Sequence, residues 1–577
     1  MDRKYIFLAI LSLLNASDSR KCPDDCRCYE NLERKYTVCE LGGLKQIPTT
    51  DMESDTQVLI ISAPRDKPNY LTIGRIFLKF SDLREIRIVQ SNLPAIGDSS
   101  FWPGDKLLLL DLSHNNITIL RDTDFNGLEN LRVLNLSYNH ISGIPSAPFR
   151  LLKSLKTLSL GNNRLRGLVP RSFYLLPELE VLDLGGNPLK DIDPEYMKDV
   201  KPLRKLVLAG CQLTRLHSLI YQQLPNLEEL DLRNNKFKFF SPEEFRYLKR
   251  LRVLRLDGNS LTVIVDKTFD GHNLDHLGLS GNRIHRITPC TFCNTSIKEL
   301  DLSNNSLISL NADVLAPLVP SLSSLNISHN PLNPRVITAV LKLLYRLEKL
   351  NIAGMGLTQL SDDTLSKNRN LRHLNASQNK FSNVSYKLLA PLKALQLLDL
   401  SKNNLRWLYP KLLEQLSNAT DLSVLHLENN PWLCQECHIV PLLTWNSTLN
   451  RCEFGQECLR CAQPPSLADR ILQTLQMEEL QPCAVSLTQP IVLPATSNIG
   501  VVVAVTIIII LLLIAVIAVV LYRQQGAVYY THEEERNHDY SFDPCFNRNG
   551  GDKRLAFINM DRIEEAPEDR QIRSNVR

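Results

Sequence analysis

The sequence predicts an α/β solenoid, a horseshoe in which short parallel strands from successive repeats stack into one curved sheet. Three observations predict this fold class. The chain has 577 residues, of which 103 are leucine, close to one residue in six. Leucines and asparagines recur together with a period of about 24 residues over most of the chain. Two cysteine clusters lie at the two ends of this repetitive part, where an open solenoid core needs covers.

Each repeat follows the pattern L-x-x-L-x-L-x-x-N-x-L. The residues around the central L-x-L are expected to form a strand with the leucines pointing inward and the intervening residues outward. The asparagine can both donate and accept hydrogen bonds, so a ladder of asparagines satisfies the buried backbone groups of the turns. Fifteen positions define this ladder: Ser91, Asn115, Asn139, Asn163, Asn187, Cys211, Asn235, Asn259, Asn282, Asn305, Asn330, Met355, Asn379, Asn403 and Asn430.

Three ladder positions depart from asparagine: Ser91, Cys211 and Met355. Cysteine replaces the asparagine only in part, because its thiol is a weak donor and acceptor. We expect Cys211 to be a buried thiol inside the ladder. An intermolecular disulfide is the alternative, since 13 cysteines, an odd number, precede the apolar segment near the C-terminus.

The repeats resemble those of the extracellular leucine-rich repeat proteins. A representative match is Leu131, Leu134, Leu136, Asn139 and Ile141, and the resemblance extends over residues 22–483. It implies about fifteen or sixteen leucine-rich repeats over residues 57–432. It also implies convex-side positions for Phe125, Phe149, Phe173, Phe245 and Phe269.

The cysteine clusters favour disulfides over zinc, because they bracket a repeat in a chain with a predicted secretory signal. We place an N-terminal cap at 20–56 and a C-terminal cap at 430–483. The resemblance implies the pairs Cys22–Cys28, Cys26–Cys39, Cys434–Cys461 and Cys437–Cys483. Cys452 and Cys458 are extra cysteines, for which we expect a third bridge in the C-terminal cap. Cys290 and Cys293 form a local bridge or remain thiols.

Residues outside the repeats predict a membrane topology. Residues 1–19 have the basic start, apolar run and small residues of a signal peptide. Residues 499–522 contain no charge and are long enough for one transmembrane helix. A connector at 484–498 precedes this helix, and a disordered cytoplasmic tail at 523–577 follows it, too short for a Toll-type signalling domain or a kinase. These features predict a single-pass type I protein of the plasma membrane with an extracellular N-terminus.

Composition and motifs argue against two broad functions. The formal net charge is only +4, and no basic stripe with interleaved aromatics is visible along the sequence, so we expect no nucleic-acid partner. No zinc-protease helix, nucleophile elbow or phosphate-binding loop is present in the sequence. We therefore expect no catalytic activity, no cofactor and no metal.

Outward strand positions predict the binding surface. In the middle repeats they mix apolar and charged residues, as a protein-binding patch with a polar rim does; a simple solvated face is the alternative. The candidate ligand-binding residues are Val181, Lys205, Glu229, Asp231, Arg233, Val253, Arg255 and Asp257. His276 and His373 also occupy outward positions and are expected to belong to the contact surface.

Glycosylation sequons narrow this prediction. Nine N-x-S/T sites are candidates for glycans: Asn116, Asn135, Asn294, Asn304, Asn326, Asn375, Asn383, Asn418 and Asn446. Asn135, Asn326 and Asn375 occupy the middle of their L-x-L and should point from the concave face. Glycans at Asn326 and Asn375 would shield its C-terminal half, whereas residues 181–257 carry no sequon.

These observations favour a non-catalytic cell-surface receptor or adhesion protein that binds an extracellular or membrane-bound protein ligand through its concave face. One alternative is an innate immune co-receptor resembling a Toll ectodomain without a signalling domain. Another is a lateral modulator of a second receptor in the same membrane.

Overall fold

The computed structural model describes residues 21–445, 458–483 and 499–528. The chain divides at residue 484 into two compact units. The first unit contains the repeats and both cysteine clusters, and the second contains one long helix. Each unit is described by itself.

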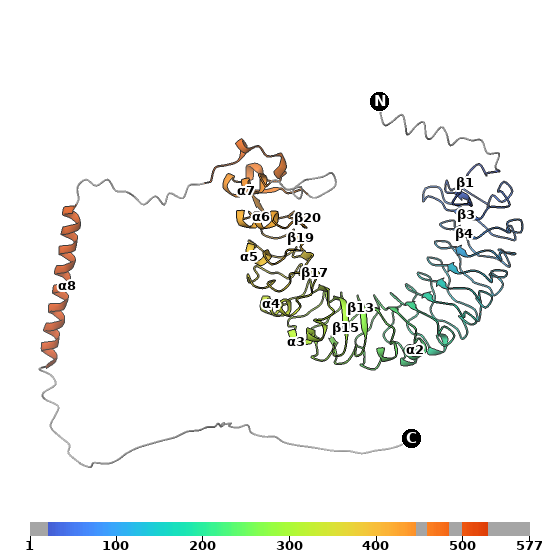
Figure 1. The fold of residues 1–577 in the computed structure, drawn as a ribbon, viewed down its shortest axis with the longest axis horizontal. Coiled ribbons are helices and arrows are strands. Elements are labelled where there is room, and N and C mark those ends of the chain that lie inside the picture. Colours follow the sequence, from blue (N-terminus) through green and yellow to red (C-terminus); the bar gives the residue numbers. More distant parts are fainter. Residues whose placement is uncertain (1–20, 446–457, 484–498, 529–577) are drawn as a thin grey trace, which may run out of the picture. The chain divides into compact units, whose positions relative to one another are not determined.

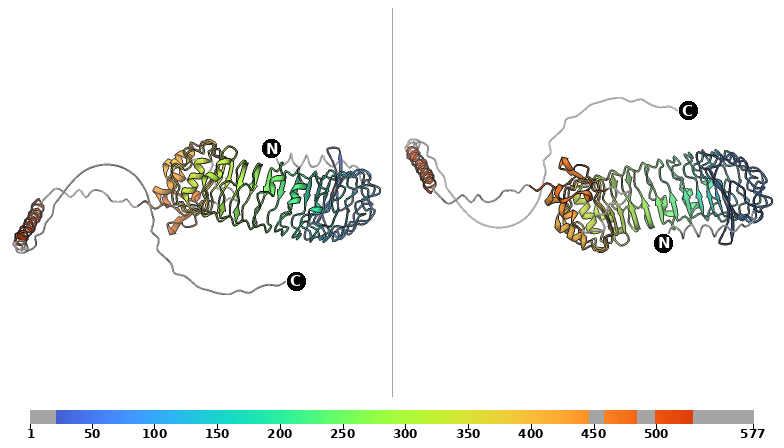
Figure 2. Two further views of the ribbon diagram at one scale, coloured as in Figure 1. Left: turned by 90° about the horizontal axis from the view of Figure 1, so that it is seen from below. Right: turned by 90° about the horizontal axis from the view of Figure 1, so that it is seen from above.

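One 18-stranded sheet lines the inner side of the first unit, which curves as a horseshoe (Figure 1). Its first two strands form an antiparallel hairpin, and every later strand is parallel to its neighbours. Seen from below and from above, the repeats follow one another along a single band (Figure 2). The strands are β1 (Arg27–Asn31), β2 (Arg34–Cys39), β3 (Val58–Ile61), β4 (Glu85–Ile88), β5 (Leu109–Asp111), β6 (Val133–Asn135), β7 (Thr157–Ser159), β8 (Val181–Asp183), β9 (Lys205–Val207), β10 (Glu229–Asp231), β11 (Val253–Arg255), β13 (Asn273–Gly278), β15 (Ser296–Asp301), β16 (Ser324–Asn326), β17 (Lys349–Asn351), β18 (His373–Asn375), β19 (Leu397–Asp399) and β20 (Val424–His426).

Most strands begin one residue before the leucine pair of the repeat pattern, while β13 and β15 begin three residues earlier. In β6, Leu134 is central and fully buried, while Val133 and Asn135 are half-buried on the outward side. Leu136 follows the strand and is also fully buried. The predicted inward and outward alternation is thus confirmed, with the second leucine in the turn rather than in the strand.

The asparagine ladder ties each repeat to both of its neighbours. The Asn139 Nδ2 donates to the carbonyl of Leu112 at 2.9 Å and to that of Leu136 at 3.1 Å. Its Oδ1 accepts from the backbone N–H of Ile117 at 3.0 Å. One side chain therefore satisfies three buried backbone groups, as the recurrence of asparagine predicts.

Cys211 is a free, fully buried thiol within this ladder, as predicted. Its Sγ donates to the carbonyl of Leu184 at 3.3 Å, and burial raises the pKa of the thiol to about 12. A thiol does not supply the acceptor that the asparagine side chain provides. Two residues after Asn163, the N–H of Leu165 donates to Oδ1 of the next ladder residue, Asn187. The equivalent N–H of Leu189, whose next ladder residue is Cys211, donates instead to the Asn187 carbonyl at 2.8 Å. The cysteine thus replaces the donor of the asparagine but not its acceptor.

Short helices and turns form the outer, convex side of the horseshoe (Figure 1). Their phenylalanines stack across repeats, with ring centroids 5.5 Å apart for Phe125 and Phe149 and 6.2 Å apart for Phe245 and Phe269. This confirms the expected convex-side phenylalanines, all of which are buried. The α-helices are α2 (Ser218–Gln223), α3 (Ala312–Leu315), α4 (Pro334–Leu343), α5 (Tyr386–Leu389) and α6 (Pro410–Ser417). The 3-10 helices are Pro194–Tyr196, Phe245–Tyr247 and Ala316–Leu318, and β12 (Val263–Ile264) pairs with β14 (Arg286–Ile287).

The two caps contain the disulfides that the resemblance implied. The bonds are Cys22–Cys28, Cys26–Cys39, Cys434–Cys461 and Cys437–Cys483. Cys290 and Cys293, whose state the sequence left open, form a local bridge. Cys458 is also disulfide-bonded, while its expected partner Cys452 lies outside the described residues. The C-terminal cap adds α7 (Glu436–Leu443), β21 (Trp432–Leu433), β22 (Cys461–Gln463) and the 3-10 helices Pro465–Leu467, Leu472–Thr474 and Met477–Glu479.

The second unit contains α8 (Ile499–Val528), which includes the predicted membrane segment. Among the helices of the described residues, none is both long and apolar enough to cross a membrane. The predicted signal peptide at 1–19, the connector at 484–498 and the tail beyond residue 528 lie outside the described residues, as does the sequon at Asn446.

Candidate concave binding surface

The concave face carries the outward residues of the strands, which the parallel register sets side by side. In the middle repeats, Val181, Lys205, Glu229 and Val253 form one row across β8 to β11. A second row runs beside it through Asp183, Val207, Asp231 and Arg255. We call the outward residues of β8 to β11, with Arg233 and Asp257 in the turns that follow, the middle segment.

Charges of the middle segment pair with one another. The Lys205 Nζ lies 3.1 Å from Glu229 Oε2, and Arg255 on the next strand forms an ion pair with the same carboxylate. One glutamate thus joins three adjacent strands. All three side chains remain partly exposed, so the network is accessible from solvent.

A second pair of the middle segment joins Asp231 and Arg233. The guanidinium donates through Nε and Nη2 to the carboxylate, at 3.0 and 2.6 Å. The Asp231 side chain is only 4% exposed, against 46% for Arg233. Hydrogen bonding to Asp231 raises the pKa of the Arg233 guanidinium. Asp231, a predicted contact residue, therefore supports Arg233 from below, and Arg233 presents the accessible charge.

Two further carboxylates flank these pairs. The Asp257 Oδ1 accepts from the backbone N–H and the hydroxyl of Ser280, both at 2.9 Å. Asp183 accepts from the N–H of Gly185 at 2.9 Å, but burial raises the pKa of its carboxyl group. The structure thus brings the eight predicted residues together on one face, with Val181 and Val253 at its two sides. Seven of them are accessible, but Asp231 is buried beneath Arg233, so the prediction of Asp231 as a contact residue is wrong.

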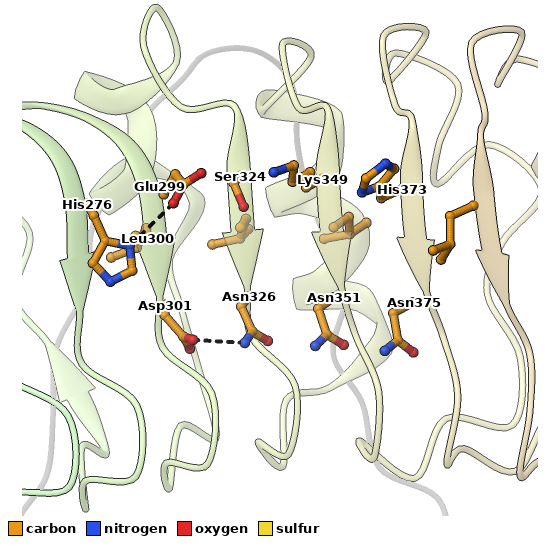
Figure 3. A pocket seen from close by; sticks show the side chains of 13 residues that line it. His276, Glu299, Leu300, Asp301, Ser324, Asn326, Lys349, Asn351, His373 and Asn375 are labelled. Carbon is orange, nitrogen blue, oxygen red and sulfur yellow. Dashed lines mark hydrogen bonds and ion pairs between the residues drawn. The ribbon is translucent and has the colours of Figure 1, made fainter. Parts of the chain in front are cut away.

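A hollow that the sequence analysis did not predict lies further along the same face. It is open, has a volume of about 370 Å³ and is lined by strands β13 to β19 (Figure 3). The side chains of Glu299, Ser324, Lys349 and His373 form one row, and those of Asp301, Asn326, Asn351 and Asn375 form a second. His276 Nδ1 lies 3.4 Å from Glu299 Oε2 at one end of the hollow. Both histidines predicted for the contact surface therefore line it.

The second row is built from turns in which each side chain bonds to its own strand end. Asn326 Oδ1 accepts from the N–H of Ser328 at 3.2 Å and from its hydroxyl at 2.8 Å, and Asn375 accepts in the same way from Ser377. Asn326 Nδ2 donates to Asp301 Oδ2 at 3.0 Å. The recurring D/N-x-S triplet therefore has a structural role in the turn. That triplet was the sequence signal from which three of the four side chains in the second row could have been inferred, and at Asn351 an alanine, Ala353, stands in place of the serine.

The same geometry locates the sequons. Asn135, Asn326 and Asn375 are outward residues of β6, β16 and β18, with the last two lining the hollow. Five other sequon asparagines are exposed and lie off these strands: Asn116, Asn294, Asn304, Asn383 and Asn418. Glycans at Asn326 and Asn375 remain a prediction, and they would occupy the hollow itself.

A metal has no suitable ligand set in the described parts of this chain. The single group of three His, Cys, Asp or Glu side chains close enough to hold an ion there is Cys437, His438 and Cys483. Two of the three are joined in a disulfide, which leaves no thiolate to bind a metal.

Comparison with known proteins decides the family. The leucine rich repeat family matches residues 81–141, 129–189, 201–261, 249–296, 272–332 and 345–405, which together make up more than half of the chain. The chain belongs to the leucine-rich repeat family. The matched residues include every strand of the middle segment and of the hollow.

Relatives share part of this repeat array. Trophoblast glycoprotein of Macaca fascicularis is 29% identical over 225 residues, covering 35% of this chain and 52% of its own. CD180 antigen of Homo sapiens is 31% identical over 199 residues, covering 34% of this chain and 29% of its own. This chain therefore spans about half or less of the length of these relatives. The solved structure of the TLR13–ssRNA13 complex has a TM-score of 0.56 at 19% identity, covering 78% of this chain and 76% of that one, which shows the fold alone.

Proposed function

We propose that this leucine-rich repeat protein is a non-catalytic cell-surface receptor or adhesion protein that binds a protein ligand through the middle segment. The observation that carries the proposal is the Lys205–Glu229–Arg255 network, flanked by the outward valines Val181 and Val253. Preorganised charges beside apolar side chains favour a specific protein interface, because few side chains must be ordered on binding.

Two further observations support this surface. Residues 136–293 contain no sequon, so no N-linked glycan is attached within the middle segment. Strands support every charged residue of the network, and sites on regular elements are more precise than sites on loops. The hollow between β13 and β19 would instead hold glycans at Asn326 and Asn375.

We infer the topology from the sequence and from the disulfides. Residues 1–19 are proposed as a cleaved signal peptide, and 499–522, within α8, as one transmembrane helix of a type I protein. Disulfides in both caps favour an oxidising compartment for the repeats. Extraction of the expressed chain with alkaline carbonate, together with protease protection of a C-terminal tag, tests this topology. Release of the uncleaved chain into the medium would contradict it.

Partner capture tests the ligand surface. The full-length chain is displayed on cells and crosslinked, and the captured proteins are identified by mass spectrometry. Inverting the network with Lys205→Glu, Glu229→Arg and Arg255→Glu keeps each ion pair but reverses the pattern. We expect at least about a tenfold loss of partner binding.

A matched control inverts an ion pair beside the same strands. Arg204 and Glu228 immediately precede β9 and β10, and their charged atoms lie 3.7 Å apart beside the beginning of these strands. The variant with Arg204→Glu and Glu228→Arg should bind as the natural chain does. Equal binding by both variants at equal surface levels would refute the site.

The identity of the partner separates the three functional classes. A protein on an opposing cell or in solution supports a receptor or adhesion role. An immune recognition molecule supports the co-receptor role, and a receptor captured from the same membrane supports lateral modulation.

A further inference from the structure

A second charged surface lies beside the concave face. It is formed by residues that follow the ladder positions in the sequence. We define the basic flank as the residues one, three and four positions after the ladder residues from Asn163 to Asn282. Its members include one acid, Asp191, and one exposed aromatic, Phe239. Eight of its residues are exposed cations: Arg164, Arg166, Lys190, Arg215, Lys236, Lys238, Arg283 and Arg286.

Stacking of the repeats brings these cations together. The backbone N–H of Lys236 bonds to the Leu213 carbonyl of the preceding repeat at 2.7 Å. The N–H of Arg283 bonds to Leu261 at 2.9 Å, and Arg286 pairs with Val263 between β14 and β12. Residues about 24 positions apart in the sequence thus become neighbours in space. Six repeats at about 4.8 Å per strand make a row of at least about 24 Å. Five of the six supply cations, and the repeat after Asn259 supplies Ser260, Thr262 and Val263 instead.

The cations of the basic flank have few acidic neighbours in the protein, although the charge of Arg286 reaches Asp266, whose pKa is lowered chiefly by the Thr288 hydroxyl. Within the described residues, none of its eight cations forms a salt bridge. The other side of the concave face, where the chain enters the strands, differs. There Arg252 and Lys298 pair with Asp275 at 2.7 and 2.6 Å, and Arg204 pairs with Glu228. Acids alternate with cations along that side of the strands, in the order Glu180, Arg204, Glu228, Arg252, Asp275 and Lys298, whereas the eight cations of the basic flank share it with one acid, Asp191. The net charge of +4 conceals this asymmetry.

Access to the basic flank is open as well. Its residues lie within 136–293, where the sequence has no N-x-S/T site. No N-linked glycan therefore projects from these repeats, whereas sequons occur on both sides of them, at Asn135 and Asn294.

We propose that the basic flank binds a linear sulfated polysaccharide. A row of exposed, unpaired cations matches a ligand with a regular series of anionic groups, and long Lys and Arg side chains adapt to sulfates without a pocket. The proposal rests on the extracellular location inferred above, where sulfated chains are available. A nucleic acid fits less well, because single strands are bound by several stacking aromatics and the flank offers Phe239 and one imidazole, His285.

Binding to immobilised heparin tests the proposal, with the full-length chain purified in detergent. The flank variant combines Arg215→Gln, Lys236→Gln and Lys238→Gln. The matched control combines Arg204→Gln, Arg252→Gln and Lys298→Gln, which removes the same charge from the other side of the concave face. We expect the flank variant to bind heparin about tenfold more weakly at 0.15 M salt and to elute at lower salt, and the control to change less than about twofold.

Several results would overturn the proposal. Equal losses of heparin affinity in the flank variant and the control would mean that heparin is attracted by net charge alone. If the natural chain bound chemically desulfated heparin as tightly as heparin, sulfate recognition would be excluded. Tighter binding of a single-stranded RNA or of anionic vesicles would assign the flank to those ligands. Heparin binding should survive inversion of the Lys205–Glu229–Arg255 network. A failure on the flank is therefore distinguishable from a failure of the concave protein site.

Discussion

The interior of the solenoid and its concave face use alternate residues of the same strands, yet they vary differently from repeat to repeat. In the interior, Leu134, Leu158, Leu182 and Leu206 repeat one residue type at one position, and all are fully buried. The outward neighbours one residue earlier are Val133, Thr157, Val181 and Lys205. Buried positions are constrained by packing and by the ladder, whereas outward positions are free to differ.

This difference separates stability from recognition within one strand. A change at an inward position should destabilise its own repeat and both adjacent repeats, because each repeat packs on its neighbours and an unpaired polar group weakens both contacts. A change at an outward position should act locally. The four predictions below test that separation, in order of decreasing effect.

The largest effect is expected for Leu184→Asp, with Val181→Asp as its control. Leu184 is fully buried beyond the end of β8, and a carboxylate there lacks a partner, costing more than about 3 kcal/mol of unfolding free energy. Val181 begins the same strand on the outward side and is half-buried. Flow cytometry of the displayed chain should show the first variant absent from the surface and the second present. Equal surface levels would contradict the inward and outward assignment.

Removing a cap disulfide should act at one end of the interior. The variant with Cys437→Ser and Cys483→Ser opens a link across 46 residues and should lose about 2–5 kcal/mol locally. Hydrogen exchange should then rise in β19 and β20 but not in β8 to β11. Replacing Cys290 and Cys293 by serine opens a link of only 3 residues and should have a smaller effect. Uniform exchange across all strands would refute local coupling between repeats.

Restoring the ladder at Cys211 should stabilise the chain by about 1 kcal/mol. An amide in Cys211→Asn would keep the donor to Leu184. It would also supply the side-chain oxygen that accepts from this N–H in other repeats, in place of the Asn187 carbonyl to which the Leu189 N–H now donates. Cys211→Ala, which loses the donor and adds nothing, should destabilise. Thermal unfolding of both variants measures the difference. A lower melting temperature for the asparagine variant would show that this site is adapted to cysteine.

The smallest effect concerns two carboxylates of the concave face. Burial raises the pKa of Asp183 in the folded state. The protonated carboxyl group therefore adds to the free energy of unfolding below the unfolded pKa, and this contribution is lost as pH rises through the folded pKa. Asp183→Asn should therefore stabilise the chain slightly at pH 7, and the gain should vanish on acidification towards pH 4. Asp231→Asn removes the partner of Arg233 and should destabilise by about 0.5–1 kcal/mol. Melting temperatures at pH 7 and pH 4 measure both effects. At pH 7 the melting temperature should rise for Asp183→Asn and fall for Asp231→Asn, and a shift in the same direction for both variants would contradict the assigned roles.

The repeated elements could be predicted from the sequence because each depends on contacts within one period. Leucine spacing determined the inward face of the strands, and asparagine recurrence determined the ladder. The four cap disulfides followed from a resemblance in their cysteine motifs. The state of Cys290 and Cys293 did not follow, because their separation of 3 residues is compatible with thiols or a bridge until the turn geometry is known.

The surfaces were decided by the tertiary structure, because they depend on contacts between repeats. Sequence spacing placed Asp231 and Arg255 together in the candidate site, but only packing buried Asp231 beneath Arg233. The hollow needs side chains from six strands, and the basic flank needs cations about 24 residues apart. The period of the sequence predicts which residues share a face. Which charges on that face meet a partner depends on distances across neighbouring strands, and these exist only once the repeats have stacked.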